Sequence, residues 1–401
     1  MNKIAIYIGN FDFPNNNAGG NRVLNNGKVL RELGYEVYFI GLKKNIPISK
    51  KNIEDTKEEY EGFTGYSLNY PASKKDWISY KKIFKKIINF LDKKFNKIDL
   101  IISYHSPRIS LFNKKLLKWS KKNNIKIVCD IDDWLPANNG NFIYRIIKFL
   151  DNYYRNSILN LKYDGLIVVS SYLENYYKNK NKNINIIRIP PLFDTEIASD
   201  SFEIKKGMNL IYTGKPFPTD GRKVKKDSYK DRLDIVIELL SEIDKNIKYV
   251  FNIYGITKEE YLRVIPKHEM LIKKLGEKII FNGFKNHKEV INEIKNSDFT
   301  VFLRDINRGS MAGFPTKFAE SFSLGTPIIT NNTSDLSDYL EEGKTGYFLD
   351  IYNLKESKKK LEKILLTPKK EILKMKENCI KKDYFNYKNK ISEMQTFLDN
   401  L

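Results

Sequence analysis

One stretch of the sequence, residues 313–327 (GFPTKFAESFSLGTP), places a single carboxylate among apolar side chains. Pro315 and Gly325 stand where a helix over about 315–324 would begin and end, because proline is favoured in the first turn and glycine just past the last. Glu320 lies one turn inside that helix. The stretch therefore predicts a short helix with an acidic group near its amino end.

The start of this helix is suited to an anion. The N–H groups near Phe314, Thr316 and Lys317 are among those that a helix leaves unpaired, and Gly313 lets a ligand approach the backbone closely. The Glu320 carboxylate is then placed to accept hydrogen bonds from two ribose hydroxyls. The alternative is an ordinary surface glutamate, which the adjacent glycine loop disfavours.

A second candidate is the basic loop that follows a predicted strand at 209–214. Positive charge gathered at a strand end suits a ligand with two phosphates. We expect one or two of its basic residues to bind a ligand and the others to form a solvated surface. These residues are Lys215, Arg222, Lys223, Lys225, Lys226, Lys230 and Arg232.

Three aspartates, Asp130, Asp132 and Asp133, cluster at the end of a strand predicted at 125–131. Alternation along the extended chain puts Asp130 and Asp132 on one side. Such a cluster is able to hold a divalent metal against a diphosphate, to act as a general base, to contact an acceptor hydroxyl, or to cap a helix through Asp133. No further ligand cluster accompanies it, so no metal site is predicted.

Two further loops follow strands in the first half of the chain. His105 comes after a predicted strand at 100–104 and is either a general base or ligand contact, or a structural histidine. Gly19 and Gly20 precede a helical segment after the first strand, where they form either a phosphate or acceptor loop or a plain turn. The latter loop matches neither the Walker A nor the GxGxxG pattern.

Short β-branched runs alternate with amphipathic segments along the chain, which predicts parallel sheets covered by helices. In the first half, strands are expected at 4–9, 36–42, 100–104, 125–131, 165–170 and 185–189. The pattern restarts with strands at 209–214, 249–255, 278–284, 299–304 and 326–332. The fold class is therefore α/β, with two doubly wound, Rossmann-like domains. Ligands of such sheets bind at the carboxyl ends of the strands.

The segment 189–207, with paired prolines and little periodicity, has the character of an interdomain linker. We expect domains at 1–195 and 196–384, with a C-terminal helix at about 385–401 that is a candidate to pack back on the first. Two such sheets facing each other would form a central cleft, which is a favoured place for a ligand.

The composition indicates a folded, basic protein. The 401 residues suit two domains, and the formal net charge of +21 favours anionic partners. No apolar run is long enough to span a bilayer, and the apolar start is too short for a signal peptide, so a cytoplasmic location is expected. Cys129 and Cys379 have no metal-type spacing and are expected in the core. Nucleic acid is disfavoured because no arginine-rich arm or zinc finger is present.

Residues 74–95 form a basic amphipathic segment in which apolar side chains recur at helical spacing between lysines. One interpretation is a helix that faces the core and exposes its lysines. The other is docking on an anionic membrane surface, at the inner face of the cytoplasmic membrane. The apolar residues are Trp77, Tyr80, Phe84, Ile87, Ile88, Leu91 and Phe95.

The stretch from Gly313 to Glu320, followed by Gly325-Thr326-Pro327, resembles the GT-B superfamily of nucleotide-sugar glycosyltransferases, especially the large family 4 group. The segments 341–348 and 165–173 are similar to that group too, so the resemblance covers nearly the whole chain. It implies an acceptor-binding domain at 1–195 and a domain at 196–384 that binds a nucleoside-diphosphate sugar.

The resemblance also implies roles for individual residues. Glu320 would bind the ribose hydroxyls, and the backbone at Thr316 and Lys317 would meet the diphosphate. The remaining implied contacts are Lys215 with Lys226 or Lys230, which would neutralise the phosphates without a metal, Gly283 and Phe284, which would border the base, and Gly19 and Gly20, which would line the cleft.

The sequence departs from the family at one position. The family commonly carries two glutamates spaced E-x7-E, but Ala312 stands eight positions before Glu320. The carboxylate expected near the sugar is missing, and Arg304, Asp305 and Arg308 are candidates to take over part of its work.

Catalysis would be a displacement at the anomeric carbon, in which Lys215, the other lysines and the helix start stabilise the leaving diphosphate. A retaining route, which the family likeness favours, needs no obligatory protein base. For an inverting route the base candidates are Asp132 and His105.

The implied function is that of a hexosyltransferase-type glycosyltransferase. It would move a sugar from a UDP or GDP sugar, a co-substrate and not a tightly bound cofactor, to a glycan or lipid-linked acceptor in cell-surface polysaccharide or glycoconjugate synthesis. One alternative is a nucleotide-sugar 2-epimerase or hydrolase of the same fold, which the scarcity of catalytic carboxylates and histidines disfavours. The other is a basic, non-enzymatic protein that binds glycan or membrane, in which the Glu320 helix would have no use.

Overall fold

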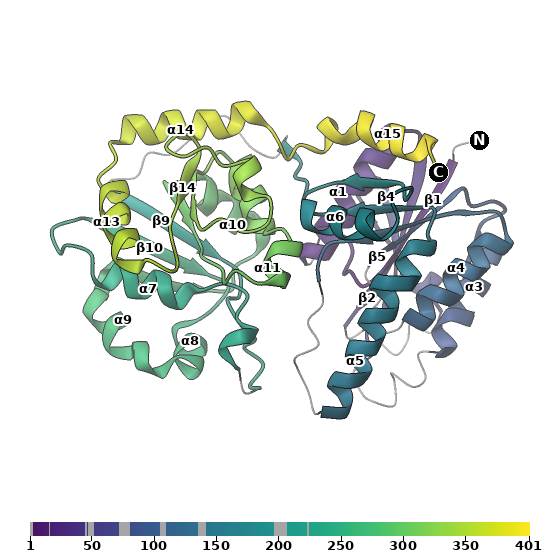
Figure 1. Ribbon diagram of the computed structural model, residues 1–401, viewed down its shortest axis with the longest axis horizontal. Coiled ribbons are helices and arrows are strands. Elements are labelled where there is room, and N and C mark those ends of the chain that lie inside the picture. The colour runs from purple at the N-terminus through teal and green to yellow at the C-terminus, as the bar shows by residue number, and fades with distance from the viewer. Residues whose placement is uncertain are drawn as a thin grey trace. The chain divides into compact units, whose positions relative to one another are not determined.

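The computed structural model describes residues 3–15, 17–44, 46, 52–71, 81–104, 110–134, 142–195, 207–222 and 224–401. These residues divide into two compact units (Figure 1). The first unit contains residues 1–194, 312–314 and 386–401, and the second contains residues 195–311 and 315–385. His105, Lys223, Trp77 and Tyr80, which the sequence singled out, lie outside the described residues.

The first unit is built on an eight-stranded sheet in the order β3-β4-β2-β1-β5-β6-β7-β8. Strand β3 pairs antiparallel with β4, and the other neighbours pair in parallel. The strands are β1 (Lys3–Gly9), β2 (Tyr35–Lys43), β3 (Glu58–Tyr60), β4 (Phe63–Asn69), β5 (Leu100–Tyr104), β6 (Lys126–Ile131), β7 (Gly165–Val168) and β8 (Ile186–Arg188).

Helices connect and cover these strands (Figure 1). The α-helices are α1 (Ala18–Glu32), α3 (Lys81–Lys94), α4 (Ser110–Lys122), α5 (Phe142–Tyr154), α6 (Ser171–Lys180) and α15 (Ile391–Asp399). The short helical segments are η1 (Glu54–Thr56), the π-helical η2 (Arg155–Leu159), η3 (Asn160–Lys162) and η9 (Tyr387–Lys390).

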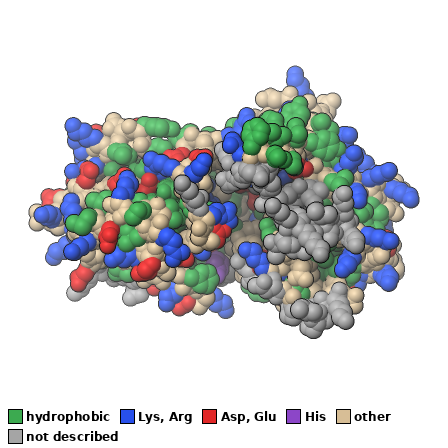
Figure 2. Space-filling view, turned by 90° about the horizontal axis from the view of Figure 1, so that it is seen from below, with side chains coloured by type: hydrophobic (Ala, Val, Ile, Leu, Met, Phe, Trp, Pro, Cys, Tyr) green, Lys and Arg blue, Asp and Glu red, His purple; other side chains and the backbone are tan. Residues whose placement is uncertain are grey.

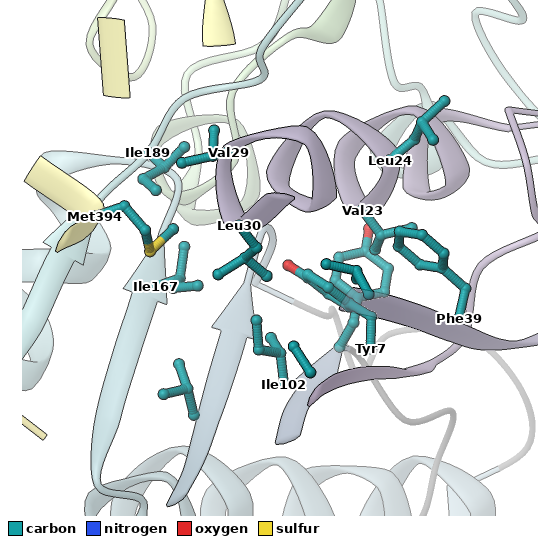
Figure 3. Close-up of a cluster of buried hydrophobic side chains, with 14 of the residues drawn as sticks. Tyr7, Val23, Leu24, Val29, Leu30, Phe39, Ile102, Ile167, Ile189 and Met394 are labelled. Carbon is teal, nitrogen blue, oxygen red and sulfur yellow. The ribbon is translucent and has the colours of Figure 1, made fainter. Parts of the chain in front are cut away.

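The core of the first unit includes residues from the far end of the chain. Figure 3 shows Met394 of α15 beside Ile167 and Ile189, and all three are buried in one apolar cluster. A β-carbon at Gly165 would lie 2.6 Å from the ring of Phe397, so only glycine lets α15 approach β7 this closely. The C-terminal helix is therefore part of this core.

A buried ion pair crosses the same core. Arg22 of α1 donates to both oxygens of Asp130 at the end of β6, and the side chains of the two residues are 4% and 0% exposed. The Tyr7 hydroxyl and the Asn26 amide also donate to Asp130. A buried carboxylate needs this number of donors, so Asp130 has a structural role and does not belong to an open acidic site with Asp132.

The second unit is built on a six-stranded parallel sheet in the order β11-β10-β9-β12-β13-β14. The strands are β9 (Met208–Thr213), β10 (Tyr249–Tyr254), β11 (Ile279–Gly283), β12 (Phe299–Val301), β13 (Ile328–Thr330) and β14 (Gly346–Phe348). The α-helices are α7 (Leu233–Ser241), α8 (Lys258–Val264), α9 (Glu269–Leu275), α10 (His287–Lys295), α11 (Arg308–Ala312), α12 (Thr316–Ser323), α13 (Leu354–Leu365) and α14 (Lys369–Lys382). The 3-10 segments are η5 (Lys226–Ser228), η6 (Pro266–His268), η7 (Gly276–Lys278) and η8 (Leu336–Asp338).

The predicted fold class, two doubly wound α/β domains, is confirmed. Every strand expected from an apolar run is present, although the runs at 299–304 and 326–332 form strands only over Phe299–Val301 and Ile328–Thr330. Strands β3, β4 and β14 were not predicted. β3 and β14 have three residues each, and β4 interrupts its apolar residues with Thr64, Gly65 and Ser67, so none of them shows a continuous apolar run.

The segment 74–95 is helical from Lys81, where its description begins, to Lys94. Ile87, Leu91 and Phe95 are buried, and the Phe84 ring packs edge to face on Phe112 of α4. The apolar side chains of the described part thus face the unit's own core. Within the described ranges, no helix is both long enough and apolar enough to cross a bilayer.

The role of Asp130 gives a first prediction. Asp130→Asn keeps the shape of the side chain but leaves the Arg22 guanidinium buried without a counter-charge, which costs about 3–5 kcal/mol. We expect the first unit to unfold at a clearly lower urea concentration. Tryptophan fluorescence reports on this unit selectively, because Trp77, Trp119 and Trp134 are the three tryptophans of the sequence and all lie within 1–194.

The control for this measurement is Asp92→Asn on the exposed side of α3, which should change the free energy of unfolding by less than about 0.5 kcal/mol. Equal midpoints for the two variants would contradict the structural role of Asp130.

Candidate functional site

The carboxyl ends of three neighbouring strands of the second unit meet through glycines. Gly214, Gly255 and Gly283 follow or end β9, β10 and β11, and the Gly255 N–H donates to the Gly283 carbonyl at 2.7 Å. A β-carbon at Gly255 would lie 2.8 Å from the backbone of Gly214, and φ at Gly255 is +100°. Only glycine fits there, and the result is a strand edge at which bare backbone is exposed to a ligand.

A charged cluster lies beside this edge. The Asp231 carboxylate, whose side chain is 1% exposed, accepts hydrogen bonds from Lys317 Nζ at 2.7 Å, Arg304 Nε at 2.9 Å and the Tyr212 hydroxyl at 2.8 Å. These residues come from the segment before α7, from α12, from the segment after β12 and from β9. One buried carboxylate therefore joins four segments.

The Lys317 ammonium links this cluster to the strand edge. A β-carbon at Gly214 would lie 3.7 Å from Lys317 Nζ, and Nζ stands 3.8 Å from the centroid of the Tyr212 ring. Because Gly214 has no side chain, this residue does not cover the Lys317 ammonium group. Lys317 was predicted to act through its backbone, whereas the structure also assigns its side chain to the site.

The protonation of the cluster reflects burial and an excess of positive charge. Burial lowers the pKa of Lys317 to about 8; the nearby charges of Arg304 and Lys230 act in the same direction, and Asp231 opposes them. Burial alone would raise the pKa of Asp231, but the charges of Lys317, Arg304 and Lys230 hold it well below its usual range. Two cations share one carboxylate, so an additional anion would be favourable here.

A second ion cluster adjoins the first in the sequence. Arg232, 9% exposed at its side chain, pairs with Asp234 at 2.7 Å and with Asp305 at 2.5 Å. Asp305 follows β12, at the carboxyl edge of the sheet, and its side chain is 35% exposed. It is therefore a half-exposed carboxylate held in place by a buried guanidinium.

Helix α12 runs from Thr316 to Ser323, inside the predicted 315–324. Pro315 is the residue before the helix and not its first residue, because its backbone is extended. Gly325 follows with a φ of +72°, as expected for the residue past a helix end. The first N–H groups of the helix, those of Thr316 and Lys317, lie at its amino end.

Glu320 is engaged by a residue that the sequence did not single out. Its Oε1 lies 2.8 Å from Nε2 of His287, the first residue of α10, and its side chain is 15% exposed. The hydrogen bond to Glu320 raises the pKa of His287, against a smaller opposing effect of burial. The sequence did contain one signal for the position of His287. Asn286 and Glu289 form a capping box, which predicts that a helix begins at His287.

The other predicted ligand residues of the second unit differ in how far they are exposed. Lys215 is exposed and donates to the Thr219 hydroxyl at 2.9 Å. Lys226 and Lys230 are exposed. Gly283 ends β11 and Phe284, the next residue, is 85% exposed. Arg304 is buried and, through Asp231, belongs to the same cluster as Lys317.

Residues Ala312, Gly313 and Phe314 group with the first unit. All three are buried, and the Ser170 hydroxyl, which caps α6, donates to the Ala312 carbonyl at 2.6 Å. Ala312, which stands where the family commonly has a glutamate, is thus fully buried. A carboxylate at this position would have to replace a 0%-exposed methyl group.

In the first unit Gly19 lies beside the Tyr104 side chain, because a β-carbon at this glycine would stand 3.1 Å from the Tyr104 hydroxyl. Asp132 accepts from the Tyr104 hydroxyl, Asp133 from the Trp134 N–H, and Asp130 belongs to the core. Gly19 and Gly20 lie inside the first turn of α1 and not before it, because Asn17 caps the helix by accepting from the Gly20 N–H at 2.7 Å. Over the described ranges, no three His, Cys, Asp or Glu side chains gather as metal ligands would.

Comparisons with known proteins bear on the fold and the family. Residues 223–384 match the family described as "Glycosyl transferases group 1". The fold is similar to the sucrose-phosphate synthase of Thermosynechococcus elongatus, with a TM-score of 0.72 and 14% identity over 99% of this chain and 98% of that one. It is also similar to a glycosyltransferase from Rickettsia africae (0.68 and 15%, over 100% and 99% of the two chains). For Anabaena Alr3699/HepE in complex with UDP and glucose, the TM-score is 0.66 with 12% identity over 100% of both chains.

The fold is that of GT-B glycosyltransferases, and the family match independently supports a glycosyltransferase. The matched residues 223–384 include Asp231, Arg304 and Lys317 of the first ion cluster and all three residues of the second. The resemblance drawn from residues 313–320 is therefore confirmed, and the non-enzymatic interpretation is not supported.

One curated relative matches in part. The UvrABC system protein C of Clostridium botulinum is 27% identical over 205 residues, which are 44% of this chain and 32% of that protein. The chain thus spans about a third of the length of that relative.

The His287–Glu320 contact predicts a measurable titration. We expect the pKa of His287 to lie above its ordinary value of 6.5 and to fall when Glu320→Gln removes the negative charge. Because the folded pKa is the higher one, the contact stabilises the fold fully below about pH 6.5 and less as pH rises through the raised pKa. NMR titration of the three histidines, with His287→Gln for assignment, measures the shift.

Glu277→Gln, a substitution at an exposed position, is the matched control and should leave the titration unchanged. An unchanged His287 curve in Glu320→Gln would show that the contact does not form in solution.

Proposed function

We propose that the protein transfers a sugar from a UDP or GDP sugar to a glycan or lipid-linked acceptor in the synthesis of cell-surface polysaccharide or glycoconjugate. The donor would bind at the carboxyl edge of the second sheet. The observation that carries this proposal is the Asp231 cluster, in which Lys317 and Arg304 share one carboxylate beside the bare backbone of Gly214.

The cluster supports diphosphate binding for electrostatic reasons. Lys317 and Arg304 are largely desolvated, and interactions with an anion are stronger there than in water. Lys215, Lys226 and Lys230, which are exposed in the segment between β9 and α7, add further positive charge. Together with the amino end of α12, these groups would neutralise two phosphates without a metal.

The nucleoside would occupy the neighbouring side of the edge. Glu320 would accept the two ribose hydroxyls, which requires that His287 share or release the carboxylate. Phe284, 85% exposed beside Gly283, offers a ring face to the base. UDP is the first nucleotide to test, because the similar HepE structure contains UDP and glucose.

The reaction would be driven at the leaving group. Negative charge builds up on the diphosphate as the anomeric bond breaks, and Lys317, Arg304 and Lys215 would stabilise it. With Ala312 in place of a carboxylate, Asp305 is the candidate to contact the donor sugar, because it is half-exposed and fixed by Arg232. Retention is favoured by likeness to the family; an inverting route would use Asp132 or His105 as the base.

Nucleotide binding gives the main test. Saturating UDP or GDP, at about 100 times its Kd, should stabilise the second unit by about 2.7 kcal/mol and raise its melting temperature by roughly 5–10 °C. Glu320→Ala should remove most of this shift because the ribose contacts are lost. Thermal-shift measurements with each nucleoside diphosphate compare wild type, Glu320→Ala and the exposed control Lys273→Ala.

No shift with any nucleoside diphosphate would refute the donor site. A shift that Glu320→Ala leaves intact would refute the role of Glu320 alone.

The lowered pKa of Lys317 predicts that the protein takes up protons when it binds a nucleoside diphosphate. The pKa of this lysine is lowered to about 8, and a diphosphate beside it would raise that pKa, so binding at pH 8 should take up protons. The affinity should accordingly fall as pH rises above about 8. Calorimetric titration in two buffers of different ionisation enthalpy measures the uptake.

Lys317→Arg provides the control for this titration, because arginine stays charged throughout the pH range. Binding by this variant without proton uptake is the expected result, whereas zero uptake in the wild type would rule out the contact between Lys317 and the diphosphate.

A further inference from the structure

Helix α5 has an apolar face that the described residues of its unit leave exposed. Its apolar residues recur at intervals of three and four, which places them on one broad side of the helix. Phe142 is 74% exposed, Ile147 60% and Leu150 57%. The others, exposed to a similar extent, are Ile143, Ile146, Phe149 and Tyr153. Scattered apolar residues are normal on a surface, but a continuous face of this kind marks an interaction site.

The helix is well anchored despite this exposure. Asp151 accepts from the Ser110 N–H at 3.1 Å and from its hydroxyl at 2.5 Å, which fixes α5 to the start of α4. The helix continues into η2, where Arg155 and Leu159 are buried. These contacts hold α5 in place on the first unit. The outward orientation of its apolar face is therefore set by the fold.

The surroundings of this face are strongly basic. Helices α3, α4 and α5, which pack in sequence against one another, contain thirteen Lys and Arg and only two acidic residues. One of the two, Asp151, is engaged with Ser110. In Figure 1, α5 reaches the lower edge of the view, and the face seen from below in Figure 2 carries a group of hydrophobic side chains with Lys and Arg beside it.

We propose that α5 docks the first unit on an anionic membrane surface, with its apolar side chains in the headgroup region and the lysines of α3 and α4 on the lipid charges. An apolar stripe with basic flanks is the combination that such surfaces bind. A second copy of this chain fits less well, because pairing the same faces would bring two sets of like charges together. A protein partner would need a matching acidic rim.

The sequence suggested residues 74–95 as a membrane contact, whereas the proposal places the apolar part of that contact on α5. In α3, Ile87 and Leu91 are buried and Phe84 packs on Phe112, so the described apolar side chains of this helix are at least partly covered by the unit itself. In α5 the apolar face is open. The proposal depends on the first unit alone and would hold even if the donor site were wrong; a surface position would bring the enzyme to a lipid-linked acceptor.

The test is flotation of the full-length protein with vesicles of phosphatidylcholine containing 30 mol % phosphatidylglycerol. Wild type should float with these vesicles and not with pure phosphatidylcholine. The triple variant Phe142→Ser, Ile147→Ser, Leu150→Ser should bind roughly tenfold more weakly or worse. Because these side chains are exposed, the variant should keep the wild-type unfolding midpoint.

A matched control removes equally exposed apolar side chains from the second unit. Met270→Ser, Tyr352→Ser, Leu366→Ser changes residues that are 72%, 76% and 66% exposed, and should bind vesicles as wild type does. Reversing the charge of Lys114, Lys118 and Arg145 to Glu should weaken binding, as should 0.5 M salt.

Three results would overturn the proposal. They are absence of binding to anionic vesicles, equal binding by wild type and the α5 variant, and a wild-type dimer in sedimentation that the α5 variant converts to monomer while neither binds vesicles. The last result would assign the face to a second copy of the chain.

Discussion

The burial of the Asp231 carboxylate is the constraint around which the second unit is arranged. A charged group at 1% exposure must be compensated by donors on several sides, and these donors come from β9, from α12 and from the segment after β12. Three elements that start far apart in the sequence are thereby held at one edge of the sheet. The cations outnumber the carboxylate, so the same interaction that fixes the geometry leaves the site receptive to an anion.

The sequence predicted the fold well and the site only in part. Apolar runs such as 100–104 and 209–214 define strands because burial on both faces selects them. The loop 215–232 contains seven basic residues, and nothing in their spacing shows that the charge of Lys230 lowers the pKa of a buried carboxylate. Asp231 and His287 were missed for the same reason, because their importance lies in contacts with residues more than 30 positions away.

Helices α3 and α5 show where periodicity stops being informative. Both have an apolar stripe at helical spacing, and the lysine-rich one was the natural candidate for a surface helix. The difference arises from neighbours. Phe90 and Phe84 of α3 meet Tyr66 and Phe112, whereas the matching residues of α5 meet no described side chain that buries them. An amphipathic pattern predicts that a helix has an apolar face, but tertiary packing determines whether that face is buried or exposed.

Because α15 is part of the core of the first unit, this core can be completed only after the C-terminal end of the chain has been synthesised. The first unit begins at the amino end of the chain, yet Met394 and Phe397 complete its core and Asn185 donates to the Phe397 carbonyl at 2.9 Å. The ribosome therefore exposes most of the eight-stranded sheet long before its last packing partner is made. Domains usually fold in order from the amino end, but here the second unit is the one whose residues have all emerged first. A chain that stopped between Phe385 and α15 would contain every residue of the second unit, while the first unit would lack Met394 and Phe397 of its core.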